Sequence, residues 1–203
     1  MKRTFLTFLL IVCILAVYGQ YSKIYEFTKD NDLANAQLSE PVTDGSWIYH
    51  MVSLGGTYNM GAIYKVRPDG SEYTKLYDFT GGLDGKLPQG SLLLSGGVLY
   101  GMTREGGLYT YGVVFKLNTD GSGFTTLLHF DGTGNGRNPY GSLIISGTTL
   151  YGMTFIGGAS NVGSIFKIST SGTGYTKIYD FTGAASGINP QGALPWLATL
   201  FSA

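Results

Sequence analysis

The chain has 203 residues, with very little cysteine and few charged residues. Its single cysteine, Cys13, lies in an apolar run near the N-terminus, so no disulfide can form within the rest of the chain. Charged residues make up 13% of the sequence and form no basic stripe, which disfavours nucleic acid and anionic membrane surfaces as partners. With so little charge, Gly, Ser, Thr, Asn and Tyr must cover the surface, as is typical of extracellular β-proteins.

The first residues have the pattern of a secretory signal peptide. Lys2 and Arg3 precede an apolar run over residues 5–18, and a cleavage site follows near Gln20. A membrane anchor would need about 20 apolar residues and a positive flank after them. Residues 1–19 are therefore expected to be removed on export. The product would be secreted, periplasmic or on the cell surface, with no membrane span.

One sequence pattern occurs three times at a period of 51 residues. Residues 99–117 read LYGMTREGGLYTYGVVFKL, and residues 150–168 read LYGMTFIGGASNVGSIFKI. The same step relates three sets of residues: Tyr49, Tyr100 and Tyr151; Phe79, Phe130 and Phe181; and Pro88, Pro139 and Pro190. A long period kept in register over three copies predicts a solenoid, an array or a propeller.

One copy contains four short segments with strand composition. They are Ser91–Ser95, Val98–Thr103, Gly112–Leu117 and Phe124–Phe130, each rich in Leu, β-branched or aromatic residues. Gly96-Gly97 suits a two-residue hairpin turn. The chain after the signal peptide has no stretch with helical periodicity and capping signals. The expected fold is therefore all-β, a β-propeller-like array of four-stranded blades.

The repeat region, residues 20–203, is expected to hold three full repeats and a partial one, at residues 28–79, 80–130, 131–181 and 182–203. A lone strand, Tyr21–Phe27, precedes them. Pro195 falls where an inner strand is due, and its missing N–H is poorly tolerated there. Since propellers usually have at least four blades, the array is expected to be incomplete, a shortened piece of a longer propeller. Open strand edges would then allow self-association.

The run from Leu76 to Leu117 resembles the GloVer tandem repeat of exported bacterial proteins. The residues that carry the resemblance are Tyr77-Asp78-Phe79, Asp84-Gly85 with Pro88, Leu99-Tyr100-Gly101-Met102-Thr103, Gly106-Gly107, and Gly112 with Phe115-Lys116-Leu117. The double glycine is also similar to the kelch pattern. The resemblance covers residues 75–192 well and residues 23–70 more loosely. It implies export, a propeller-like fold, a loop at the DGxxP segment and no defined activity.

Residues that recur in every copy are expected to serve folding, because a catalytic centre is normally made once. Asp78 and Asp180 look like paired carboxylates, but Glu26 and His129 stand at the equivalent positions of the other copies. The shared property is polarity on an outer strand. General acid–base catalysis needs a group placed against one substrate, so no catalytic residue is expected here.

No metal site or cofactor is expected either. Asp84 begins a stretch like half a calcium loop, but Asn135 and Ser186 replace it in the later copies, and too few oxygen ligands follow. A turn is the better interpretation. His50 and His129 have no companion ligands for a transition metal. Phosphate-binding and dinucleotide-binding motifs are absent from the sequence.

Residues that break the repeat are the candidates for binding. Tyr58, Arg104 and Tyr109 lie near the double glycines, and Arg137 is the odd member of its proline segment. Exposed aromatic and Arg side chains on a rigid scaffold suit a sugar or a protein surface. The alternative is ordinary drift of loop residues between copies.

We therefore expect an exported, non-catalytic binding or scaffold module at the cell surface or outside it, whose partner is a carbohydrate or a protein. The alternative is a secreted carbohydrate-active enzyme, because propellers host hydrolases and lyases with carboxylates around the central channel. A pair of repeat-breaking carboxylates on the first strands would favour the enzyme, and Glu40 alone is of this kind. A third possibility is a chain whose raw strand edges prevent a stable fold.

Overall fold

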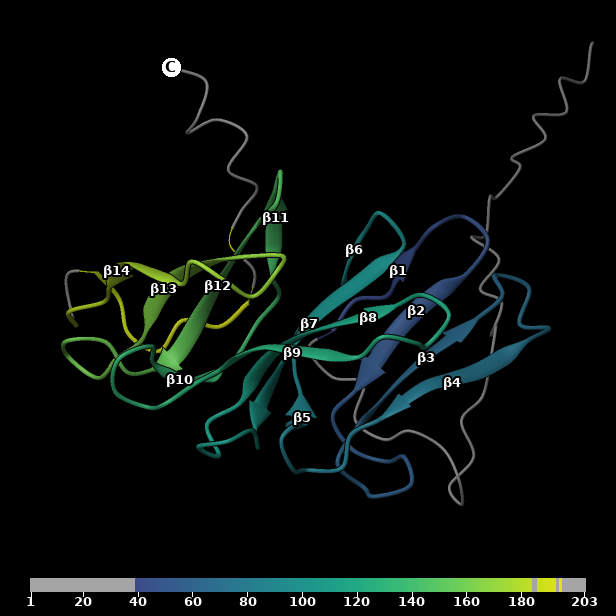
Figure 1. Ribbon diagram of the computed structural model, residues 1–203, viewed down its shortest axis with the longest axis horizontal. Coiled ribbons are helices and arrows are strands. Elements are labelled where there is room, and N and C mark those ends of the chain that lie inside the picture. The colour runs from purple at the N-terminus through teal and green to yellow at the C-terminus, as the bar shows by residue number, and fades with distance from the viewer. Residues whose placement is uncertain (1–38, 184–185, 193, 195–203) are drawn as a thin grey trace, which may run out of the picture.

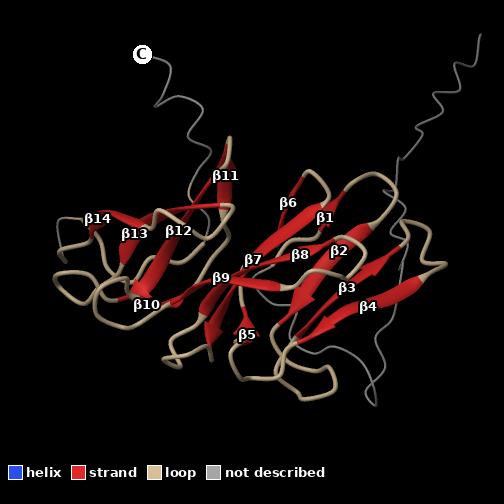
Figure 2. Cartoon of the chain, in the orientation of Figure 1, coloured by secondary structure: helices blue, strands red, loops and turns tan. Residues whose placement is uncertain are grey.

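The computed structural model describes residues 39–183, 186–192 and 194, which form three antiparallel β-sheets (Figure 1). The sheets follow one another as blades of a fan, in chain order from purple to yellow. The described residues include no helix (Figure 2). The predicted all-β, propeller-like array is thereby confirmed. The predicted signal peptide, the strand at Tyr21–Phe27 and Pro195 lie outside the described residues.

Each blade is an antiparallel meander, in which the second and third blades have a divided innermost strand. The first blade consists of β1 (Val42–Thr43), β2 (Ile48–Val52), β3 (Ala62–Val66) and β4 (Tyr73–Asp78). The second consists of β5 (Lys86–Pro88), β6 (Leu93–Ser95), β7 (Val98–Glu105), β8 (Val113–Asn118) and β9 (Thr125–His129). The third consists of β10 (Arg137–Pro139), β11 (Ile144–Ser146), β12 (Thr149–Ile156), β13 (Ser164–Ser169) and β14 (Thr176–Asp180).

The four strands predicted for one copy appear as β6 to β9, with ends shifted by one or two residues. The predicted hairpin turn joins β6 to β7. Gly96 and Gly97 both have positive φ, 58° and 77°, as a type I′ turn requires. Side chains with Cβ atoms rarely adopt this conformation, so the double glycine fixes the register of the two inner strands.

The innermost strand is split, which the sequence did not predict. β5 and β6 both pair with β7, through Pro88 opposite Thr103 and Leu93 opposite Tyr100. The proline segment is therefore a short edge strand, although we expected a loop there. Proline is tolerated because an edge strand has one side without a neighbouring strand, so the missing N–H breaks no ladder. β10 repeats the arrangement in the third blade.

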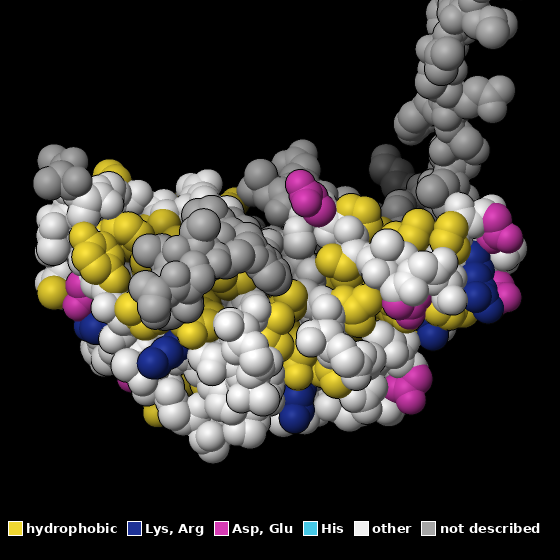
Figure 3. Space-filling model, turned by 90° about the horizontal axis from the view of Figure 1, so that it is seen from above, with side chains coloured by type: hydrophobic (Ala, Val, Ile, Leu, Met, Phe, Trp, Pro, Cys, Tyr) yellow, Lys and Arg dark blue, Asp and Glu magenta, His cyan; other side chains and the backbone are white. Residues whose placement is uncertain are grey.

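Apolar side chains fill the two spaces between blades. We call the side of a blade that faces the following blade its trailing face, and the opposite side its leading face. Between the first two blades, Phe79 and Phe115 are fully buried with ring centroids 5.3 Å apart. Burying each ring contributes about 2–3 kcal/mol. Hydrophobic side chains also reach the surface, among them a group at the left of Figure 3, where the third blade lies.

Candidate functional site

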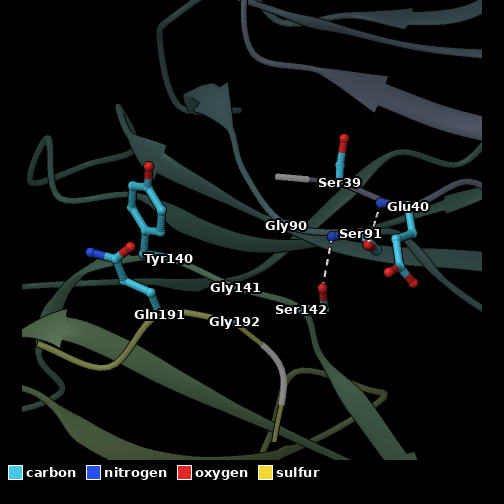
Figure 4. Close-up of a pocket in the computed structure, with 9 residues that line it drawn as sticks. All are labelled: Ser39, Glu40, Gly90, Ser91, Tyr140, Gly141, Ser142, Gln191 and Gly192. Atoms are coloured by element: carbon cyan, nitrogen blue, oxygen red, sulfur yellow. Dashed lines mark hydrogen bonds between the residues drawn. The ribbon is translucent and has the colours of Figure 1, made fainter. Parts of the chain in front are cut away.

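A pocket of about 390 Å³ opens where the inner segments of the blades converge (Figure 4). We call it the axial pocket. It is lined by Ser39, Glu40, Gly90, Ser91, Tyr140, Gly141, Ser142, Gln191 and Gly192. These residues come from the same few positions of successive repeats, because each step of 51 residues returns the chain to the axis. A small change at one repeat position therefore alters the lining of this pocket.

Glycine allows the inner segments to meet at the axis. A Cβ atom on Gly90 would collide with the carbonyl group of Gly141, and one on Gly141 would collide with the carbonyl group of Gly192. The backbones of neighbouring repeats thus touch directly. This close approach explains why small residues begin each inner strand.

Two serines connect the repeats around the pocket. The backbone N–H of Glu40 donates to Ser91 Oγ at 2.7 Å, and the N–H of Ser91 donates to Ser142 Oγ at 2.7 Å. We call this pair of bonds the serine ladder; both are drawn in Figure 4. Each hydroxyl accepts from the backbone and keeps its own proton. Among the described residues neither hydroxyl has an acceptor for that proton, so both can donate into the pocket.

Other polar groups that line the pocket also have no hydrogen-bond or ion-pair partner among the described residues. None of the ion pairs or side-chain hydrogen bonds of the described chain includes the carboxylate of Glu40, the hydroxyl of Tyr140 or the amide of Gln191. The ring of Tyr140 contacts Phe155 at 5.8 Å between centroids, tilted by 41°, and the Arg104 guanidinium lies 5.8 Å from its centroid. The pocket thus combines donors, acceptors and one supported aromatic ring.

Beside the pocket, Ser39 and His50 have the geometry of a nucleophile and its base. Ser39 Oγ lies 2.9 Å from His50 Nε2, and the hydroxyl of Tyr64 lies 3.1 Å from Nδ1. However, Nε2 also lies 3.2 Å from the carbonyl oxygen of Ser39, which can only accept. Nε2 must then carry the proton, and Nδ1 accepts from Tyr64. A protonated Nε2 cannot take the serine proton, so in this tautomer the imidazole is not a general base for Ser39.

The same cluster replaces a packing pair of the later blades. Gly101 lies where a Cβ would come within 2.5 Å of Phe115 Cζ, so the later blades need glycine beside phenylalanine. The first blade has His50 and Tyr64 at these two positions. Burial lowers the pKa of His50, which is only 7% exposed, and the bond to Ser39 O opposes this in part. The imidazole is therefore neutral and hydrogen-bonded on both sides.

Neither of the two predicted arginines lines the pocket, although Arg104 contacts its Tyr140. Arg104, at the end of β7, stacks on Tyr140 and has its Nε 3.9 Å from Glu105. Arg137, in β10, lies over the ring of Tyr111 at 5.7 Å and donates to Asn161 Oδ1 at 3.3 Å. Both guanidinium groups thus contact groups of the protein itself.

The two predicted tyrosines are exposed on equivalent loops. Tyr58 is 55% exposed between β2 and β3, and Tyr109 is 50% exposed between β7 and β8. No ring contact joins either tyrosine to another described aromatic residue, and neither lines the pocket. Tyr140, Gln191 and the serine hydroxyls are lining groups that were not predicted from the sequence. The signal was present, because Gly90-Ser91 and Gly141-Ser142 already indicated crowding at the axis.

The recurring polar residue of the outer strand fastens the double-glycine loop. Asp78 accepts from the N–H and hydroxyl of Thr57, and it pairs with Lys75 at 2.7 Å. In the second blade His129 Nδ1 accepts from the N–H of Leu108. Burial alone would raise the pKa of Asp78, but the bonds from Lys75 and Thr57 outweigh it and lower the pKa. The position thus has a structural partner in each of these two blades.

Asp84 caps a turn. Its carboxylate accepts from the N–H and hydroxyl of Thr80 and from the hydroxyl of Tyr77. Asn135 and Ser186 accept from the N–H groups of Asp131 and Thr182 in the same way. In residues 39–183 and 186–192, no three His, Cys, Asp or Glu side chains gather as a metal site would require. The same ranges contain no helix long and apolar enough to cross a membrane.

Comparison with known proteins identifies a family and a fold. The chain matches the family described as the Gloeobacter/Verrucomicrobia repeat over residues 11–199. No curated protein matches it. Among solved structures it is similar to one from the nidogen/laminin complex, with a TM-score of 0.51 and 16% identity over 73% of this chain and 48% of that one. A putative TolB from Agrobacterium tumefaciens has a TM-score of 0.47 and 15% identity over 73% of this chain and 50% of that one. The chain thus spans about half the length of these matches.

Proposed function

Because the chain belongs to the Gloeobacter/Verrucomicrobia repeat family, we propose that it is an exported, non-catalytic binding module that takes a hydroxyl-rich ligand, such as a carbohydrate, in the axial pocket. The observation that carries this proposal is that several hydrogen-bonding groups without a partner among the described residues line the same pocket. Two serine hydroxyls offer donors, Glu40 offers acceptors, and Gln191 offers both. A sugar ring presents hydroxyl groups that satisfy such a mixed set.

The supported ring of Tyr140 adds to the fit. A sugar has apolar C–H faces as well as hydroxyls, and an aromatic ring supported by contacts with Phe155 and Arg104 gives such a face a rigid surface. A rigid ring loses little conformational entropy on binding, which favours affinity. Arg104, a candidate from sequence, would then act on the ligand through Tyr140.

The composition of the pocket supports binding over hydrolysis. Most glycosidases place two carboxyl groups about 5–9.5 Å apart across the bond that is cleaved. Glu40 is the only carboxylate among the nine residues that line the pocket. One carboxylate can orient a hydroxyl group, but it cannot fill both of the carboxyl roles that such an enzyme needs. Export is supported by the apolar run over residues 5–18 and by the low charge of the chain.

The test is binding of the secreted protein to a panel of oligosaccharides by calorimetry, with Glu40→Gln as the probe variant. We expect Glu40→Gln to weaken the best ligand about tenfold or more, because a charge-assisted hydrogen bond is lost. The matched control is Glu72→Gln, since Glu72 is an exposed carboxylate paired with Arg67 and does not line the pocket. Equal loss of affinity in both variants would contradict binding of the ligand in the axial pocket. Release of new reducing ends from the bound sugar would favour the enzyme instead.

A further inference from the structure

The first repeat differs from both later repeats at four positions in or beside the axial pocket. Where the later repeats have glycine, glycine, phenylalanine and serine, the first has Ser39, His50, Tyr64 and Glu40. Ser39 and Tyr64 both contact the imidazole of His50, and Glu40 follows Ser39 in the chain. Independent drift of single residues does not produce side chains that fit one another. The cluster is made once, beside the only carboxylate among the nine residues that line the pocket.

The peptide group that joins Ser39 to Glu40 is hydrogen-bonded at both of its polar atoms. Its carbonyl oxygen lies 3.2 Å from His50 Nε2, and its N–H donates to Ser91 Oγ at 2.7 Å. The side chain of Ser39 adds a second contact to the same ring, since its Oγ lies 2.9 Å from Nε2. His50 thus extends the serine ladder by one step, from β2 across this peptide group to the second repeat.

The position of the Glu40 carboxylate depends on this peptide group. Figure 4 shows the side chains of Ser39 and Glu40 pointing to opposite sides of the segment that they share. Ser39 Oγ contacts the first blade, where it donates to Met51 O at 3.3 Å. The carboxylate has no partner of its own among the described residues, so its backbone alone places it. His50 makes one of the two bonds that hold that backbone.

The neutral imidazole fits the cluster, whereas the charged one does not. Tyr64 donates its hydroxyl proton to Nδ1 at 3.1 Å, so a second proton on the ring would place two donors face to face. His50 is also only 7% exposed, and burial disfavours the charged ring. A second proton therefore favours movement of the ring toward water, away from the peptide group that it holds.

No charged group of the described chain offsets this burial. On the leading face of the first blade, the ring is bonded to Tyr64 of β3 and to the hydroxyl and carbonyl groups of Ser39. Tyr73 of β4 lies behind Tyr64, with ring centroids 5.6 Å apart. None of the ion pairs among the described residues includes His50. The imidazole thus has only neutral groups to compensate a charge.

We propose that His50 is a positioning residue of the axial pocket: as a neutral imidazole it holds the Ser39–Glu40 peptide group, and with it the Glu40 carboxylate, and protonation releases both. The use of the carboxylate by a ligand rests on the proposed function, whereas the link between His50 and the peptide group does not. A sugar bound through the carboxylate would be released in acid.

The test is an NMR titration of the secreted, isotope-labelled protein without a ligand, from about pH 7.5 to about pH 5, where histidine titrates. We expect His50 to carry its proton on Nε2 at the start. Because burial lowers its pKa from 6.5, the second proton should bind below that pH. The amide signals of Glu40 and Ser91 should shift with the same midpoint as the ring. They should still do so in Glu40→Gln, which has no carboxylate to titrate at this position.

Two variants and one control separate positioning from a general effect of acid. His50→Gly combined with Tyr64→Phe installs the pair of the later repeats and should abolish the shifts. His50→Gln can donate to Ser39 O but cannot take up a proton, so the Glu40 amide should keep its neutral-state position. The control is His129→Asp, which installs the residue of the first and third repeats and should leave the shifts unchanged. Circular dichroism checks that each variant is folded at each pH.

Amide signals of Glu40 and Ser91 that stay fixed while His50 titrates would overturn the proposal. Shifts that survive in the double variant would do the same.

The oligosaccharide panel gives an independent check. Any sugar that Glu40→Gln weakens should bind about fivefold less tightly to the double variant at about pH 7.5, since site couplings typically begin at that size. Its affinity for His129→Asp should be unchanged. A double variant that binds such a sugar as tightly as the parent would contradict the positioning role. If Glu40→Gln weakens no sugar, the proposed function fails, and the titration still decides the role of His50.

Discussion

Leu87 adopts a left-handed backbone conformation, with φ of 52°, that asparagine adopts in both later copies. Asn138 and Asn189 have φ values of 51° and 49°, and each side-chain amide donates to a carbonyl group of the preceding blade. Asparagine tolerates this region because its side chain forms local hydrogen bonds, whereas leucine is strained there. The contact between the first two blades thus includes a strained backbone at Leu87, which asparagine avoids at the equivalent positions of the later copies.

Replacing Leu87 by asparagine should therefore stabilise the protein. We expect Leu87→Asn to raise the free energy of unfolding by about 1 kcal/mol, the typical cost of the left-handed conformation for an ordinary residue. Urea denaturation measures the change. Asn138→Leu is the reciprocal control and should destabilise by a similar amount. A loss of stability in Leu87→Asn would show that packing of the leucine side chain outweighs the strain.

The buried His50 makes stability depend on pH. Its pKa is below the ordinary value of 6.5 because of burial, so the unfolded chain takes up a proton at a higher pH than the folded chain does. The contribution of His50 to the free energy of unfolding should be fully present above about pH 6.5. It should fall as the pH is lowered from there toward the folded-state pKa. His129 contributes in the same direction, since burial also lowers its pKa.

The matched variant is His50→Gly combined with Tyr64→Phe, which installs the pair found in the second blade. We expect this double variant to keep the fold and to lose much of the pH dependence between about pH 6.5 and 5.5. Urea denaturation at several pH values gives the slope of the free energy of unfolding against pH. An unchanged slope would assign the effect to His129 or to other groups.

At the scale of elements, the serine ladder joins inner segments that no β-strand pairing connects. Ser142 Oγ accepts the N–H of Ser91, and removal of the hydroxyl leaves that donor without a partner. Ser142→Ala should lower the free energy of unfolding by about 1–3 kcal/mol, the cost of an unsatisfied backbone group. Ser146→Ala, at an exposed position of β11, is the control. Equal effects in thermal denaturation would refute a role for the ladder.

The strands themselves could be predicted because alternation, turn glycines and the 51-residue period agree at each position. β6 to β9 follow the predicted segments within two residues. β5 and β10 could not be predicted in this way, because proline normally signals a break. Pro88 belongs to a strand only because the far end of β7 extends past β6 and gives it a partner. That extension is a property of the folded sheet.

At the scale of the molecule, the axial pocket could be predicted from the sequence only in part. The repeat predicts that equivalent positions meet near an axis, and the small Gly90-Ser91 and Gly141-Ser142 fit that prediction. The repeat does not predict which side chains stay available to a ligand. Their availability depends on hydrogen bonds between copies, such as the one from Glu40 N to Ser91 Oγ. Tyr58 and Tyr109 are repeat-breaking aromatic residues that the sequence predicts to be exposed, and they are exposed. Their loops lie away from the lining of the pocket.

The bonds that tie each blade to its predecessor set an order in time as well as in space. The N–H of Leu87 donates to Met60 O, and that of Asn138 donates to Tyr111 O, so the first residues of a new blade close onto the blade already made. A chain emerging N-terminus first, from a ribosome or a translocation pore, can complete one blade contact every 51 residues without waiting for its far end. Only the newest blade is then vulnerable to proteases or misassociation at any moment.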